Sequence, residues 1–202
     1  MNTPLSLVRG AVALLVAGAA VLPCATQAQE TPWLVRVRAV HLDSANKDST
    51  GLNLSIDNKV IPELDISYFF SPQWSAELVL TYPQKQTLSS GGTEIGTLKH
   101  LPPTLTAQYH FTGLGGVVPY VGAGVNYTHF SSLNLPAGVG VKRNSYGLAL
   151  QVGADIPLTK NLALNLDLKK VQIRTDVSAG GTTLGTFKID PLLVGVGLGW
   201  RF

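Results

Sequence analysis

Apolar and polar residues alternate along most of this chain. In residues 192–202 every even position is apolar, whereas the odd positions hold Leu193, three glycines and Arg201. Residues 146–156 and 162–168 carry the same pattern. A period of two places successive side chains on opposite faces of a β-strand. Most of these segments are about ten residues long, the length of a tilted strand that crosses a bilayer.

Five further segments fit this pattern, so the sequence predicts eight strands. The eight segments are 33–43, 60–70, 74–82, 103–111, 120–130, 146–156, 162–168 and 192–202. The segments 71–73, 112–117 and 157–160 are short connections, and the segments 44–58, 83–100, 131–144 and 178–187 are longer ones. Short turns on one side and long loops on the other are typical of outer-membrane barrels. We therefore predict an all-β fold, an eight-stranded antiparallel transmembrane β-barrel.

The charge content indicates which face of the barrel points outward. A soluble barrel of the lipocalin kind also alternates, but its apolar face points inward. Only 13% of the residues are charged, about half the usual share in a soluble domain. The polar faces would therefore coat a soluble surface poorly but would fill a narrow lumen well. Aromatic residues near strand ends suit the interfacial girdles of a membrane barrel, although aromatic core packing would also explain them: Trp33, Tyr68, Trp74, Tyr82, Tyr127, Trp200 and Phe202.

Residues 1–28 are predicted to be a secretory signal peptide. Arg9 precedes 14 almost uninterrupted apolar residues, 10–23, and the small residues Thr26 and Ala28 suit cleavage after Ala28. The apolar stretch is shorter than the roughly 20 residues of a membrane-spanning helix, which disfavours an uncleaved anchor. Pro23 disfavours acylation of Cys24. The barrel would then occupy residues 29–202 of a protein exported to the cell outer membrane.

Charged residues of both signs occupy the alternate strand positions whose side chains are predicted to point into the barrel. They are Arg36, Arg38, Glu63, Asp65, Glu77, Asp155, Asp167, Lys169 and Arg201. Unpaired charges are costly in a medium that screens less than water, so we expect these residues to pair with one another. We interpret Arg36, Arg38, Glu63, Asp65 and Glu77 as a polar plug of the lumen, in preference to a selectivity filter.

Sequence signatures of catalysis are absent, and we predict that the protein is not an enzyme. There is no GxSxG, HExxH or Walker motif. His41 with Asp43 and Ser44 is the best candidate for a hydrolase site, but a solvated strand end explains these residues better. The four histidines lack metal-ligand spacing, so no metal and no cofactor is expected. No Lys/Arg run indicates nucleic-acid binding.

The predicted outer segments contain two unusual features. They are rich in apolar residues, among them Leu52, Leu54 and Ile56, so either the strands extend beyond the bilayer or these residues line a hydrophobic entrance. Pro102 and Pro103 each lack the N–H that a β-ladder needs. The pair would open a gap in the barrel wall, which is either a lateral opening or only a strand start.

Two sequence blocks carry a resemblance to a known family. Residues 100–105, His-Leu-Pro-Pro-Thr-Leu, and residues 119–124, Pro-Tyr-Val-Gly-Ala-Gly, resemble the central signature of the OmpW family of small outer-membrane proteins. Residues 151–155, 190–191 and 199–202 resemble its later strands. The resemblance implies an eight-stranded barrel over residues 29–202, with a hydrophobic channel that opens sideways at Pro102 and Pro103. It does not extend to the outer loops and indicates no particular solute.

The resemblance thus implies an outer-membrane channel for passive uptake of small hydrophobic compounds, with lateral release into the membrane, and we adopt this as the expected function. Leu52, Leu54 and Ile56 would line its entrance. The expected partners are outer-membrane lipid, a small apolar solute and the barrel assembly machinery, for which Phe202 resembles the carboxyl-terminal recognition signal. A structural, adhesive or receptor barrel without transport is the alternative.

Overall fold

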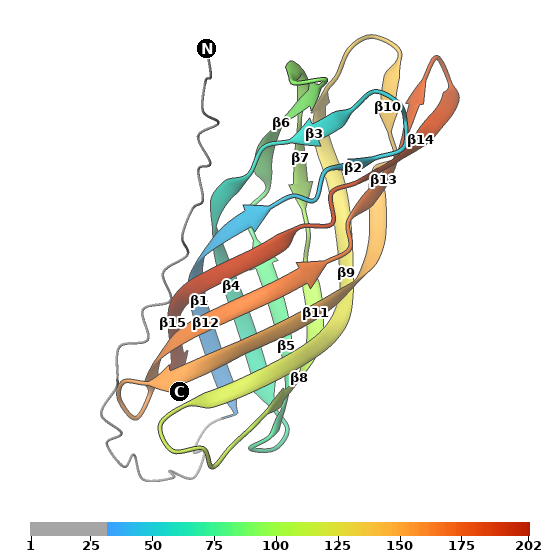
Figure 1. The fold of residues 1–202 in the computed structure, drawn as a ribbon. Coiled ribbons are helices and arrows are strands. Elements are labelled where there is room, and N and C mark those ends of the chain that lie inside the picture. Colours follow the sequence, from blue (N-terminus) through green and yellow to red (C-terminus); the bar gives the residue numbers. More distant parts are fainter. Residues whose placement is uncertain (1–31) are drawn as a thin grey trace, which may run out of the picture.

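The computed structural model describes residues 32–202, which form an antiparallel β-barrel with a long extension at one end (Figure 1). The predicted signal peptide, residues 1–28, lies outside the described residues. Eight strands make up the barrel wall: β1 (Trp33–Asp43), β4 (Lys59–Phe69), β5 (Trp74–Thr81), β8 (Thr104–His110), β9 (Val118–Asn134), β11 (Asn144–Pro157), β12 (Leu162–Val171) and β15 (Leu192–Arg201). Each of them overlaps one of the predicted segments.

The wall is closed, because every wall strand has a partner on both sides. β1 pairs with β4 on one side and with β15 on the other, from Leu34↔Arg201 to Asp43↔Leu192. β11 lies between β9 and β12 and completes the ring. All of these pairings are antiparallel, so the predicted fold class is confirmed.

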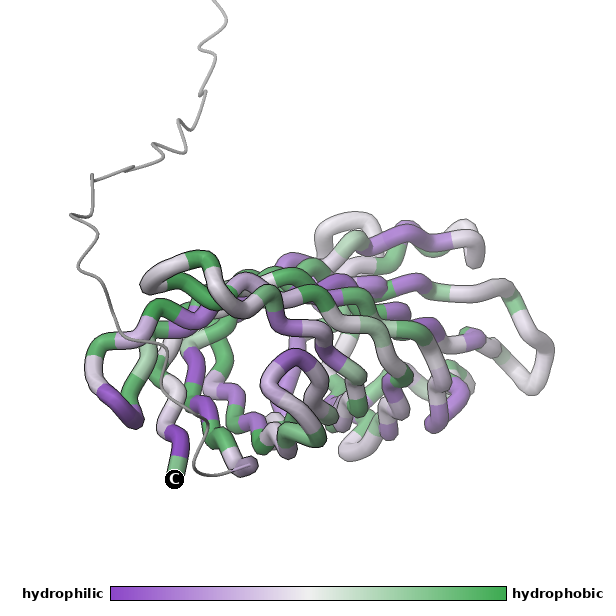
Figure 2. Tube along the Cα trace, turned by 90° about the horizontal axis from the view of Figure 1, so that it is seen from below, coloured by the Kyte–Doolittle hydropathy of each residue, from purple (hydrophilic) through white to green (hydrophobic). Residues whose placement is uncertain are grey.

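The apolar faces of the wall strands point outward. On β15, Val194, Val196 and Leu198 are about half exposed, whereas Gly195 and Gly199 on the opposite face are buried. The alternation of hydropathy along the wall strands can be followed in Figure 2. This arrangement is the reverse of a soluble barrel and matches a lipid-facing wall. In residues 32–202 no helix combines the length and the apolar character needed to cross a membrane.

Exposed aromatic side chains gather at both ends of the wall. Near the short turns, the Trp33 and Tyr68 rings lie 4.8 Å apart and the Trp74 and Tyr109 rings 5.1 Å apart, centroid to centroid. Near the opposite end, the rings of Tyr127 and Tyr146 lie 5.1 Å apart. Because all of these side chains except the half-buried Tyr109 are exposed, they do not form an aromatic core, and their placement suits two interfacial girdles.

The long outer segments, which were predicted as connections, contain strands, in agreement with the alternative that the strands extend beyond the bilayer. These strands are β2 (Lys47–Asp48), β3 (Leu54–Ile56), β6 (Gln84–Ser90), β7 (Thr93–Leu101), β10 (Val139–Val141), β13 (Arg174–Ala179) and β14 (Thr182–Lys188). β6 and β7 form a hairpin between β3 and the outer half of β9, and β13 and β14 form another between β10 and β2. Each hairpin turns through two glycines at positive φ, Gly91-Gly92 and Gly180-Gly181, as two-residue turns require.

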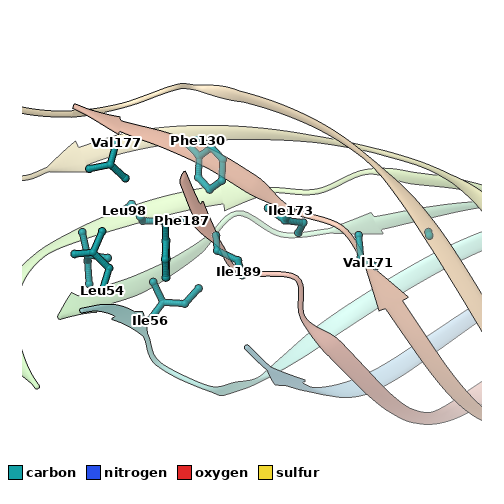
Figure 3. Close-up of a cluster of buried hydrophobic side chains, with 11 residues drawn as sticks. Leu54, Ile56, Leu98, Phe130, Val171, Ile173, Val177, Phe187 and Ile189 are labelled. Atoms are coloured by element: carbon teal, nitrogen blue, oxygen red, sulfur yellow. The ribbon is translucent and has the colours of Figure 1, made fainter. Parts of the chain in front are cut away.

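An apolar core fills the outer extension (Figure 3). Leu54, Leu98, Phe130, Val177 and Phe187 come from five different strands and are each at most 3% exposed. Inward faces are therefore apolar in the extension and polar inside the membrane wall. The reversal follows from the surroundings, since the outside of the wall contacts lipid and the outside of the extension contacts water.

Gly197 on β15 lies where a side chain would collide with the neighbouring strand. A Cβ atom there would stand 2.0 Å from the carbonyl oxygen of Val37, whereas a Cβ atom at Gly195 would meet side-chain atoms alone, the nearest of them in Arg38 at 3.3 Å. We expect Gly197→Ala to lower the free energy of unfolding by about 1–3 kcal/mol and Gly195→Ala to have a much smaller effect. Urea unfolding in lipid vesicles, followed by tryptophan fluorescence, measures both. Equal stability of the two variants would contradict the close approach at Gly197.

Candidate functional site

Arg36 joins three strands across the lumen of the wall. Its Nε and Nη2 atoms donate to the two carboxylate oxygens of Asp155 at 3.1 and 2.6 Å. Its Nη1 atom donates to Asp65 at 3.3 Å and to the Ser67 hydroxyl at 3.1 Å. The forked contact to Asp155 is the geometry that a guanidinium makes best. This one side chain therefore links β1 to β4 and β11.

Arg38, two residues further along β1, holds a second group of carboxylates. Its Nε lies 2.9 Å from Glu63, and its Nη2 lies 2.5 Å from Asp65 and 3.2 Å from Glu77. Its Nη1 donates to Asn165 on β12 at 3.1 Å. The five residues predicted to form the lumen plug are thus brought into one network.

Further side chains complete this network. Lys169 lies 3.4 Å from Glu63, and Asp167 accepts hydrogen bonds from the Tyr120 hydroxyl at 2.7 Å and from the Gln151 amide at 2.6 Å. Tyr120 and Gln151 were not predicted as lumen residues from the sequence. Their positions on the inward faces of β9 and β11 could have indicated this role. An eight-stranded lumen is only just wide enough for side chains, and here they fill it.

Arg201 shares the inward parity but lies apart from this network. Its guanidinium stands 4.0 Å from the ring centroid of Phe69, near the end of β15 and the short turns. Within residues 32–202 it takes part in no ion pair. It therefore covers the foot of the lumen rather than joining the plug.

The residues predicted to line the entrance belong to the apolar core of the extension. Leu54 and Ile56 are buried in it, and Leu52 packs against it. Two polar side chains hold β3 in place. Asn46 donates to the Ile56 carbonyl at 3.1 Å and accepts from its N–H at 3.0 Å, while Asp48 accepts from the Leu54 N–H at 3.0 Å. Because the core is packed, a solute would have to part these side chains to enter.

Pro102 and Pro103 interrupt the strand that runs from β7 to β8. Within the described residues, no ladder pair joins residues 80–83 to residues 101–103, although pairing is present on both sides of this stretch. Pro83 lies on the facing segment, so three residues at this point lack an N–H. The wall therefore has a local gap between its β5–β6 and β7–β8 segments.

Asn126 of β9 secures the other side of the gap. Its Nδ2 atom lies 3.3 Å from the Pro102 carbonyl oxygen, 3.1 Å from that of Pro103 and 2.9 Å from the Thr104 hydroxyl. The Tyr127 N–H also donates to Pro103, at 3.1 Å. The proline segment is thus tethered to β9 and unpaired toward β5 and β6. Sequence reasoning missed Asn126, because nothing in its spacing predicts this contact.

Two hollows meet the proline segment from opposite sides. Inside, a narrow cavity of about 20 Å³ touches Pro102 and Thr104. Outside, an apolar groove of about 750 Å³ runs over the lipid-facing wall from Leu78 to Leu148 and touches Pro103 and Thr104. Thr104 lines both hollows. A path from the lumen to the lipid at this point would therefore pass Thr104.

The remaining predicted residues lie elsewhere on the barrel. His41 and Asp43 are exposed on the outer face of β1, and Asp43 accepts a hydrogen bond from Asn58 at 2.7 Å. Phe202 is about half exposed, and its N–H lies 3.4 Å from the Trp33 carbonyl oxygen. Its role as an assembly signal stays a prediction.

Comparison with known proteins agrees with this architecture. The OmpW family model matches residues 33–202. The uncharacterised outer-membrane protein y4mB of Sinorhizobium fredii is 40% identical over 185 residues, 85% of this chain and 80% of that protein. The dibenzothiophene metabolism operon protein PahQ of Pseudomonas aeruginosa is 27% identical, over 88% of this chain and 92% of PahQ. The crystal structure of the outer membrane protein OprG from Pseudomonas aeruginosa matches with a TM-score of 0.70 and 26% identity, over 85% of this chain and 96% of OprG.

Removing Arg38 should destabilise the barrel strongly. Arg38→Met leaves Glu63, Asp65 and Glu77 buried with one cation fewer, and breaking such a pair costs about 3–5 kcal/mol of unfolding free energy. Lys142→Met is the matched control, because Lys142 is exposed and its nearest carboxylate oxygen is 4.0 Å away; we expect a change within about 0.5 kcal/mol. Urea unfolding in vesicles measures both. Similar stability of the two variants would contradict a tightly coupled plug.

Acid should loosen the β3 segment through Asp48. Partial burial disfavours the charged form, but hydrogen bonds from the Leu54 and Thr50 N–H groups outweigh it and hold the pKa of Asp48 below its ordinary value of 3.8. The stabilisation is therefore complete above about pH 4 and is lost as the pH falls through the folded-state pKa. Amide hydrogen exchange at Leu54 should speed up below pH 4, beyond the intrinsic pH effect. In Asp48→Asn this extra acceleration should disappear, and its persistence would contradict the assignment.

Proposed function

This chain belongs to the OmpW family and is an outer-membrane β-barrel, and we propose that it is a passive channel that takes up small hydrophobic compounds and releases them sideways into the membrane. One observation carries the proposal. The inner cavity and the outer apolar groove both touch Thr104, beside two prolines that remove the ladder from the wall.

The filled lumen favours a sideways path over a straight one. Arg36, Asp65 and Glu77 have no exposed surface, so water and ions find no space among them. An apolar molecule that passed through this ionic network would also separate the buried charges from their partners, which is unfavourable. A solute that entered the extension would therefore leave above the network, where the proline segment lies.

The outer groove gives such a solute a favourable destination. Its walls include Leu78, Leu105, Val125 and Leu148, which face the lipid. An apolar molecule gains roughly 25 cal/mol for each Å² of surface that leaves water. Transfer from the apolar core through the gap to this groove keeps the molecule out of water throughout, so no energy source is needed.

The relatives support an aromatic or similar apolar solute. PahQ is named for the dibenzothiophene metabolism operon, and dibenzothiophene is a flat, sparingly polar ring system. We propose the same class of solute for this chain. The further proposed partners are outer-membrane lipid at the groove and the barrel assembly machinery during insertion, with Phe202 as its signal.

Restoring the ladder donors should slow uptake. We expect cells that express the protein to take up naphthalene several-fold faster than cells without it. We expect Pro102→Val with Pro103→Val to remove most of this gain, because the new N–H groups allow the gap to close. The measurement is the initial rate of cell-associated naphthalene, with surface expression and heat-dependent gel mobility confirming a folded barrel.

The matched control replaces two prolines at the opposite end of the wall, Pro119 of β9 and Pro157 of β11. The variant Pro119→Val with Pro157→Val should transport like the wild type. Equal uptake by cells with and without the protein would refute transport. Unchanged uptake by the folded Pro102→Val, Pro103→Val variant would refute the lateral path alone.

A further inference from the structure

Above the ionic network, three side chains have buried polar atoms that find no partner within residues 32–202. They are the Thr81 hydroxyl, the His100 Nδ1 atom and both ends of the Gln86 amide. His100 is 1% exposed and Gln86 is fully buried. A buried polar group without a partner is costly, and folded proteins contain few of them. Here three such groups lie along one seam, the line where β5 and β6 face β7. Their grouping indicates a partner that is not part of the chain.

Two of these groups line the same narrow cavity at the gap. Thr81 and His100 share it with Pro102 and Thr104. The ion pair of Glu63 with Lys169 also lines this cavity, and so do apolar residues of the extension. The polar pair therefore sits between the plug, the apolar core and the proposed exit.

Val171 and Ile173 from the apolar core of the extension line this cavity, together with the buried Leu42 and Ile61 of the wall. Val171 and Ile173 are at most 2% exposed and belong to the same packed cluster as Leu98. Leu98 is the ladder partner of Gln86. Gln86 consequently lies further out along the same seam, within the apolar core.

The size and chemistry of the cavity restrict its occupant. About 20 Å³ accommodates one water-sized group. The Thr81 hydroxyl can donate or accept, and the His100 nitrogen does either according to its tautomer. An uncharged hydroxyl or carbonyl oxygen meets both groups. A charged group would need to cross the apolar core of the extension, where its desolvation is unfavourable.

We propose that Thr81 and His100 bind the hydroxyl or carbonyl oxygen of an otherwise apolar solute, whose hydrocarbon body lies among the apolar side chains above. Gln86 is an earlier contact for the same oxygen on the way in. The proposal rests on the uptake function and adds a substrate class to it: singly oxygenated hydrocarbons are preferred over the parent hydrocarbons. A site that holds only a fixed water would show no such preference.

The test compares 1-naphthol with naphthalene, which differ by one hydroxyl. Binding to the purified protein in lipid nanodiscs is measured by equilibrium partitioning, and empty nanodiscs give the lipid contribution to be subtracted. We expect 1-naphthol to bind about tenfold more tightly than naphthalene, the factor expected for one satisfied buried hydrogen bond. The ring signals of His100 in NMR spectra should shift with 1-naphthol and much less with naphthalene.

Thr81→Val with His100→Phe should abolish the preference. Both changes remove unpartnered polar atoms, so they should not weaken the fold. Thr81→Ser alone retains a hydroxyl and should retain the preference. Thr97→Val is the matched control, since Thr97 lies on β7 in the parity opposite to His100; it should bind like the wild type.

The outcomes separate this proposal from the uptake function. Equal binding of the two compounds by the wild type, or an undiminished preference in the double variant, would overturn the polar site. If the polar site fails in this way, the channel is still supported provided that cells with the wild-type protein take up both compounds faster than cells without it. Uptake of neither compound would overturn the channel and the polar site together.

Discussion

Backbone hydrogen bonding in hydrocarbon is the constraint on which this structure depends. A strand inside a bilayer has no water for its N–H and C=O groups, so every strand needs a partner on both sides. The pairing of β1 with β15 supplies the last of these partners and closes the ring. Once the ring is closed, a missing ladder pair matters, and Pro102 and Pro103, which cannot donate, lie in such a stretch between the β5–β6 and β7–β8 segments.

The width of an eight-stranded ring then determines what the lumen contains. The ring has room only for side chains, and the bilayer outside excludes charge, so the charged residues of the wall turn inward. Arg36 and Arg38 bring together carboxylates from four other strands and make the lumen a solid ionic core. Beyond the membrane the same ring faces water, and its inward side chains become apolar. Any solute that uses this barrel meets an apolar core above an ionic one, and the gap lies where the two meet.

Much of this arrangement could be predicted from local pattern. The ends of β1 coincide with the predicted segment 33–43, and the inward parity of Arg36, Glu63 and Glu77 was enough to predict their pairing. The outer segments were predicted only as long connections, with extension of the strands left open, because short strands with few alternations look like turn-rich segments. β6 and β7 can be identified as strands only once the tight turn at Gly91 and Gly92 is known to pair one with the other.

Other features could not be found in this way, because they depend on residues that meet across the ring. Asn126 contacts Pro102 and Pro103 from a strand more than twenty residues away. The unpaired atoms of Thr81 and His100 are recognised only when every possible partner has been placed.

The sequence by itself determined the membrane strands, their outward and inward faces, the ionic character of the lumen and the position of the two prolines. These follow from a period of two, from charge and from the missing proline N–H, which are properties of neighbouring residues. Only the tertiary structure decided that the outer segments form a packed extension, that Asn126 tethers the gap on one side, and that Thr104 separates an inner cavity from a lipid-facing groove. Such features arise from distances between residues far apart in the chain, which closure of the ring sets and local pattern does not contain.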